Sequence, residues 1–262
     1  MMPRNALLAS ALGVAVLAGT CSWNRTAAAQ AGFGTIKGRV VWGGAEVPKL
    51  EPKVKKGDAS VKDGPVCATN EIPNEEYVVD PATKGVANAF AYVTTPKGSN
   101  PAAEQELLSR SATVDLDQKG CRFVPHALAM HKDQELVFKS SDPVGHNIRY
   151  NGFTVGGFNQ MLAPNGKQGV KMASAEKNPV AVQCDIHPWM TAYFMVFDHP
   201  FFAVTKPDGS FEITGVPAGA QKFVVREDKG KFITLGGRNG IAVEVKPGEV
   251  TDVGELKLMP AK

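Results

Sequence analysis

The chain has 262 residues, of which 29 are lysine or arginine and 26 are aspartate or glutamate, so its formal net charge is only +3. A chain so close to neutral has no electrostatic case for binding nucleic acid or an anionic membrane, and neither is expected as a partner. The length exceeds what one small β-sandwich needs and suits two.

Residues 1–31 have the pattern of a secretory signal peptide. Arg4 supplies a short positive region, an apolar run of 14 residues follows, and small residues then offer cleavage after Ala29 or Ala31. The run is too short to span a bilayer comfortably. An uncleaved anchor is one alternative, and a lipid anchor at Cys21 is another, although the small residues before it are out of register by one. We therefore predict an exported protein of the periplasm, the cell surface or the secreted fraction, with membrane attachment only in the two alternative cases.

The pattern of the remaining chain indicates short β-strands. Many runs alternate apolar and polar residues and are flanked by turn residues, and the 27 glycines and 18 prolines are spread along the chain. One segment, 100–112, has the composition of a short helix. The sequence therefore predicts an all-β protein of one or two sandwiches, with two suiting its length. The predicted strands are 35–42, 75–80, 87–95, 111–117, 134–141, 146–155, 169–175, 179–184, 191–198, 201–205, 209–216, 221–228, 241–248 and 251–259.

Three cysteines remain once Cys21 has left with the leader. Export makes disulfides legitimate, and the economical solution pairs Cys67 with Cys121 and leaves Cys184 for another purpose. Such a bridge closes a loop of about 55 residues and stabilises the fold by about 4 kcal/mol on the chain-entropy model. The alternative is that Cys67 and Cys121 are two buried thiols.

The segment "AVTKPDGSFEITGVPAGAQKFVVRE" (203–227), with its two turns and the strand between them, resembles the carboxypeptidase regulatory-like domain, a transthyretin-like β-sandwich. The opening strands of that family are matched by 36–48 and 86–96, about 100 residues upstream. The resemblance implies a sequence-discontinuous sandwich, whose first part with a linking region is 34–111 and whose second part is 198–260. A second β domain, 112–197, is then inserted between them. The alternative is that the two halves belong to separate structures.

The heptapeptide "CDIHPWM" places Cys184, His187 and Met190 on one loop between two predicted strands. Thiolate and thioether suit Cu(I), and imidazole suits both oxidation states of copper. A blue-copper centre needs one more imidazole, and His146 in "SSDPVGHNIRYN" stands at the head of a predicted strand, 38 residues before Cys184.

With these residues in place, 112–197 resembles a cupredoxin, and the C-x2-H-x2-M spacing is most similar to the amicyanin subgroup. The resemblance implies a Greek-key β-sandwich that holds one type 1 copper. Its ligands are expected to be His146, Cys184, His187 and Met190, the last as a weak axial ligand.

The same resemblance implies roles for the neighbours of these ligands. Asn147 is expected to tie the two ligand loops together by hydrogen bonds, and Pro188 to stiffen the short loop. The family exposes the edge of the loop histidine, here His187, in an apolar patch where electrons leave. Trp189 is expected to contribute to that patch.

Other interpretations of the heptapeptide are weaker. A c-type haem needs a second cysteine before the histidine, a structural zinc site draws two paired ligand clusters, and a cysteine nucleophile needs a histidine facing it. A plain turn would leave a free thiol in an exported protein. His126 and His131 are expected to be packed or on the surface, with His126 the first further ligand to consider, and His199 is expected at the junction between domains.

The absence of His-x-His pairs from a chain with five histidines argues against an oxidase or a nitrite reductase. We therefore expect an electron carrier, not an enzyme, that docks weakly with redox proteins. Two alternatives stay open. The chain is then either a surface-binding scaffold for carbohydrate or protein with a secondary copper site, or a protein for copper storage or delivery.

Overall fold

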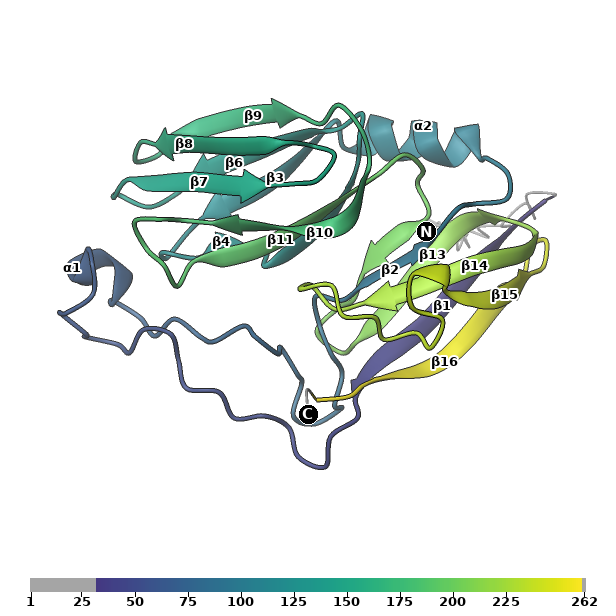
Figure 1. The fold of residues 1–262 in the computed structure, drawn as a ribbon, viewed down its shortest axis with the longest axis horizontal. Coiled ribbons are helices and arrows are strands. Elements are labelled where there is room, and N and C mark those ends of the chain that lie inside the picture. Colours follow the sequence, from purple (N-terminus) through teal and green to yellow (C-terminus); the bar gives the residue numbers. More distant parts are fainter. Residues whose placement is uncertain (1–31, 261–262) are drawn as a thin grey trace, which may run out of the picture.

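The computed structural model describes residues 32–260, and the predicted signal peptide lies outside that range. The described chain forms two β-sandwiches, each made of two sheets, that pack beside each other (Figure 1). The predicted all-β fold class is therefore confirmed.

The first of these, the inserted sandwich, is formed by β3 to β11. One sheet has the order β4-β3-β6-β9 and the other β5-β11-β10-β7-β8. In β6 the fully buried Leu136 and Phe138 alternate with half-buried residues, the period of two that predicts a strand. The strands are β3 Thr113–Gln118, β4 Phe123–Val124, β5 Ala127–His131, β6 Glu135–Ser140, β7 His146–Asn151, β8 Gly157–Leu162, β9 Lys167–Lys171, β10 Glu176–Gln183 and β11 Thr191–Phe197.

The second, the split sandwich, combines strands from both ends of the chain. Its sheets have the orders β13-β1-β16 and β12-β2-β14-β15, so strands that precede the inserted sandwich pair with strands that follow it. Its membership of the carboxypeptidase regulatory-like family stays a prediction, as do the domain boundaries. The strands are β1 Phe33–Trp42, β2 Phe90–Val93, β12 Phe202–Val204, β13 Ser210–Pro217, β14 Gly219–Arg226, β15 Ile241–Val245 and β16 Val250–Leu258.

The predicted helix is present as α2 (Pro101–Arg110), which connects β2 to β3. Its N-terminus is capped by Asn100, whose Oδ1 accepts a hydrogen bond of 3.1 Å from the N–H of Ala103. A single 3-10 turn, η1 (Gly237–Asn239), precedes β15. Within residues 32–260, no helix has the length and apolar character that a membrane crossing requires.

Residues 43–89, which we call the strap, leave the split sandwich after β1, reach the inserted sandwich and return to β2 (Figure 1). The strap contains only one short helix, α1 (Gly64–Cys67). The predicted strand 75–80 is wrong, because this segment makes only one isolated bridge, between Val79 and Val86. Side chains also hold this segment, since Glu75 and Glu76 form ion pairs with Arg122 and Lys229.

A small apolar core joins the two sandwiches. His199 lies in the connection between β11 and β12, with its ring centroid 5.4 Å from that of Phe197 and 5.5 Å from that of Phe201. The shared core consists of Phe90, Tyr92 and Val224 from the split sandwich and Ala127, Met195 and Phe197 from the inserted one.

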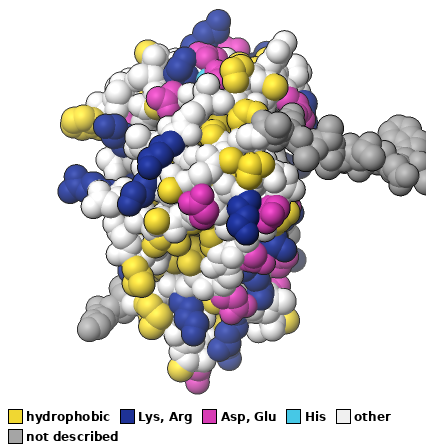
Figure 2. All heavy atoms as spheres, turned by 90° about the vertical axis from the view of Figure 1, so that its right-hand side faces the viewer, with side chains coloured by type: hydrophobic (Ala, Val, Ile, Leu, Met, Phe, Trp, Pro, Cys, Tyr) yellow, Lys and Arg dark blue, Asp and Glu magenta, His cyan; other side chains and the backbone are white. Residues whose placement is uncertain are grey.

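On the face shown in Figure 2, acidic and basic side chains are intermixed and do not gather in a patch of one sign.

Candidate metal centre

The residues predicted as ligands come together at one end of the inserted sandwich. His146 is the first residue of β7, and Cys184, His187 and Met190 lie on the loop between β10 and β11. Because β7 runs antiparallel to β10, the start of one lies beside the end of the other. The alignment of these two strands therefore brings His146 to the loop.

Three donor atoms of this group face a common point. Nδ1 of His146 lies 2.9 Å from Nδ1 of His187, and Sγ of Cys184 lies 3.9 Å and 3.7 Å from these two nitrogens. A triangle with these sides has a circumradius of about 2.1 Å, close to the bond lengths of about 2.0–2.3 Å that the first-row ion Zn²⁺ makes to imidazole and thiolate. One metal ion therefore fits between the three atoms.

The outer nitrogen of each imidazole is bound by a carboxylate. Nε2 of His146 lies 2.9 Å from Oδ2 of Asp142, and Nε2 of His187 lies 3.0 Å from Oδ2 of Asp63. An imidazole that donates its N–H at Nε2 turns the lone pair of Nδ1 toward the centre. Two such lone pairs at 2.9 Å repel each other, so the arrangement calls for a cation between them, either a proton or a metal ion.

The centre is enclosed. The side chains of both histidines are fully buried, and Cys184 and Met190 are each 1% exposed. The loop closes on itself, because the N–H of Met190 donates to the carbonyl of His187 at 2.9 Å and the N–H of Cys184 donates to the carbonyl of Met190 at 3.3 Å. The axial role of Met190 stays a prediction.

The surroundings favour the thiolate form of Cys184. Burial raises the pKa of this thiol, but hydrogen bonding with the imidazoles of His146 and His187, when a proton occupies the centre, outweighs burial and lowers the pKa to about 6. Burial acts against protonation of His146, yet Asp142 and Cys184 raise its pKa to about 9. The thiolate is the form that binds metal.

Asn147 connects the two parts of the centre. Its Oδ1 accepts a hydrogen bond from the N–H of Asp185, and its Nδ2 donates to Oδ2 of the same residue at 3.0 Å. These bonds join β7 to the loop directly beside His146 and Cys184. Pro188 is exposed on the loop.

The expectation of an exposed His187 edge is wrong. The imidazole has no exposed side-chain surface, because Asp63 of the strap covers and binds its outer nitrogen. Trp189 is half-buried, and its ring centroid lies 5.2 Å from that of His187. Its Nε1 donates to the carbonyl of Cys121 at 3.1 Å.

The structure contains the disulfide between Cys67 and Cys121, with a Cα–Cα distance of 5.2 Å, and Cys184 is the one free cysteine of residues 32–260. Cys67 ends α1, four residues after Asp63. The bridge therefore holds the strap to the inserted sandwich directly beside the candidate centre.

His126 and His131 lie outside the ligand cluster. Nε2 of His126 is 2.8 Å from Oδ2 of Asp228, and its Nδ1 is 3.6 Å from Oε2 of Glu75. His131 is buried. Both histidines are therefore packed, which is one of the two placements expected for them.

Two functional candidates, Asp63 and Asp142, are missing from the sequence-based prediction. Asp142 had a usable signal, since it stands four residues before His146 in the same turn. Asp63 had none, because no strand pattern or spacing connects it to residues more than 80 positions away.

No protein-family model and no curated protein matches the chain. Similar solved structures include a reduced mutant of amicyanin, which is 13% identical with a TM-score of 0.30 and matches 33% of this chain and 83% of its own. Amicyanin from Paracoccus versutus (Thiobacillus versutus) is 14% identical with a TM-score of 0.29 and matches 41% of this chain and 97% of its own. The Cu-containing nitrite reductase from Thermus scotoductus SA-01 is 17% identical with a TM-score of 0.30 and matches 32% of this chain and 22% of its own.

Proposed function

We propose that this chain is an exported protein that holds one type 1 copper ion and carries single electrons between redox proteins. The observation that supports the proposal is the triangle of two imidazole nitrogens and one thiolate, whose centre lies about 2.1 Å from each donor. A donor set of two histidines and one cysteine with a weak axial methionine is typical of blue-copper electron transfer.

The residues of the chain have separate tasks in this proposal. His146, His187 and Cys184 would hold the ion through two imidazole nitrogens and a thiolate, and Met190 would add a weaker thioether donor. Copper, when bound, supplies a one-electron redox couple. Asp142 and Asp63 fix the two imidazole rings, so the donors keep their positions in both oxidation states. A site that does not rearrange suits rapid electron transfer.

The proposed activity is transfer, not catalysis, and the partners are redox proteins that dock weakly. Burial of all four ligands favours retention of the ion over delivery to another protein. A chelator challenge separates the two functions. A carrier keeps its copper through repeated oxidation and reduction, and a delivery protein gives it up.

The direct experiment is to add Cu(II) to the purified metal-free protein and record its visible spectrum. We expect an intense blue or green thiolate-to-copper band and reversible one-electron reduction, and Cys184→Ser should abolish the band. Met172→Leu, which alters a buried thioether on the connection between β9 and β10, is the matched control and should keep it. A colourless protein with metal bound would rule out the type 1 site.

A further inference from the structure

None of the predicted ligands of the proposed carrier is exposed to solvent, so electrons have no direct route to the metal centre. His146 and His187 are fully buried, and each outer nitrogen is bound by a carboxylate. Cys184 and Met190 are 1% exposed. An electron that enters or leaves the centre must therefore pass over at least one further side chain.

Trp189 is the side chain placed to do so. Its ring packs against the ring of His187, with 5.2 Å between centroids, and it is half-buried. The hydrogen bond from Nε1 to the carbonyl of Cys121 fixes the orientation of the indole. Trp189 thus connects a predicted ligand to the boundary of the protein.

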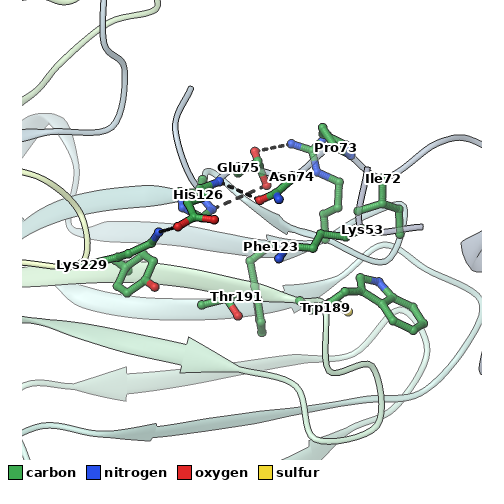
Figure 3. A pocket seen from close by; sticks show the side chains of 14 residues that line it. Lys53, Ile72, Pro73, Asn74, Glu75, Phe123, His126, Trp189, Thr191 and Lys229 are labelled. Atoms are coloured by element: carbon green, nitrogen blue, oxygen red, sulfur yellow. Dashed lines mark hydrogen bonds and ion pairs between the residues drawn. The ribbon is translucent and has the colours of Figure 1, made fainter. Parts of the chain in front are cut away.

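This boundary is a pocket of about 200 Å³ between the strap and the inserted sandwich. Trp189 lies at one end of it and Lys229 toward the other, with Phe123 between them (Figure 3). Met190 also lines the pocket, but it is only 1% exposed, whereas the indole of Trp189 is half-buried. Because a cavity of about 150 Å³ can hold a benzene molecule, this pocket has room for a group the size of one ring.

The charge of the lining favours an anion. Four basic side chains line the pocket or its rim, and they outnumber the three acidic groups that pair with them or stand beside them. His126 is counted as a cation because its ring lies between two carboxylates, with Nε2 2.8 Å from Oδ2 of Asp228 and Nδ1 3.6 Å from Oε2 of Glu75. The basic side chains are Lys53, Arg122, His126 and Lys229, and the acidic ones are Glu75, Glu76 and Asp228.

We propose that Trp189 carries electrons between the metal centre and an anionic, ring-sized group of the redox partner that enters this pocket, while Asp63 closes the route over the edge of His187. The inference rests on the proposed copper site and identifies the place at the protein surface where electrons enter or leave it. One electron leaves the partner, passes over the indole and reduces Cu(II) to Cu(I), or passes in the reverse direction. No bond forms or breaks and no proton is transferred.

The test is stopped-flow oxidation of the reduced, copper-loaded full chain by the anion hexacyanoferrate(III). We expect Trp189→Leu to slow the reaction on the order of tenfold, equal to about 1.4 kcal/mol in activation free energy, with the reduction potential unchanged. Trp189→Phe keeps a ring against His187 and should retain most of the rate. An unchanged rate in Trp189→Leu would overturn the inference.

Two variants of Asp63 test whether this residue closes the route over the edge of His187. Asp63→Ala should uncover His187, so the double variant Asp63→Ala/Trp189→Leu should regain the rate that Trp189→Leu alone loses.

Lys53→Gln should slow the reaction with hexacyanoferrate(III) and leave the reaction with the cation tris(phenanthroline)cobalt(III) unchanged. Equal effects on both reagents would contradict a pocket that accepts an anionic group.

A readout without electron transfer is the ring N–H of His187 in ¹⁵N NMR spectra of the diamagnetic Cu(I) protein. We expect slow exchange with solvent in the parent and fast exchange in Asp63→Ala, since only the parent has the carboxylate cover. Fast exchange in the parent would show that the His187 route is open and would overturn the inference. If the parent protein shows no coloured band after addition of Cu(II), the proposed function itself fails, which is a different outcome.

Discussion

Asp142 accepts hydrogen bonds from three groups at once, namely the backbone N–H groups of Gly120 and Cys121 and the ring of His146. A carboxylate held by two N–H groups is a fixed partner for the imidazole. The position of His146 at the centre therefore depends on residues outside the predicted ligand set.

Replacement of Asp142 by asparagine tests this dependence. We expect Asp142→Asn to lower copper affinity by about 10–100-fold, because a carboxylate that orients a metal-binding histidine contributes an effect of that size. Competition with a chromophoric chelator measures the affinity. Asp115→Asn, on an exposed ion pair with Lys139 in the same sandwich, is the matched control and should leave it unchanged.

Met190 offers a second test at the same scale. Met190→Leu removes the thioether and keeps the buried volume similar, so the loss of a donor should disfavour Cu(II) and raise the reduction potential. Voltammetry of the copper-loaded variant gives the value. A potential equal to that of the parent would disprove the axial role.

The four predicted ligands could be found from the sequence because residue type, order and spacing agree in two separate segments. The carboxylate of Asp63 could not be found in the same way, since its role depends on three-dimensional contact alone. The cover over His187 was mispredicted for that reason. The family resemblance covers 112–197, and Asp63 lies outside it.

At the scale of elements, the strap is the part of the chain that secondary-structure patterns describe least well. Strands such as β6 were predictable because buried and less buried side chains alternate along them. The segment 75–80 has the composition of a strand, but Glu75 and Glu76 use their side chains for ion pairs across to other elements. Composition alone cannot distinguish these two outcomes.

The disulfide is the covalent attachment of the strap. Cys67→Ser/Cys121→Ser should lower the free energy of unfolding by about 4 kcal/mol, since the bridge closes a loop of 54 residues. Urea titration of the metal-free protein measures the change. Lys55→Gln, at an exposed strap position, is the control and should be close to the parent.

At the scale of the whole molecule, His126 joins three parts of the structure. The histidine belongs to the inserted sandwich, Glu75 to the strap, and Asp228 to the loop after β14 in the split sandwich. Burial disfavours the charged imidazole, but the two carboxylates outweigh it and raise the pKa from 6.5 to about 9. The protonated form therefore holds the three parts together.

This arrangement predicts a pH dependence of stability. The folded pKa lies above the unfolded value, so the contribution is complete below about pH 6.5 and is lost as the pH rises through 9. The loss amounts to up to about 3 kcal/mol for a shift of this size. Denaturant unfolding of the parent and His126→Gln between pH 6 and 10 tests it, and equal pH profiles for the two proteins would contradict it.

The Cys67–Cys121 bridge has a chemical consequence beyond attachment. Sγ of Cys121 lies in a group with Asp142 and His146 whose ligand atoms are all within 4.8 Å of one another. As a free thiolate it would be a second sulfur donor beside a predicted ligand and would compete with Cys184 for the ion. In the disulfide this sulfur has no charge to offer. In the language of synthesis, Cys67 is a protecting group, supplied by a segment outside the inserted sandwich, and an excised 112–197 domain would lose it.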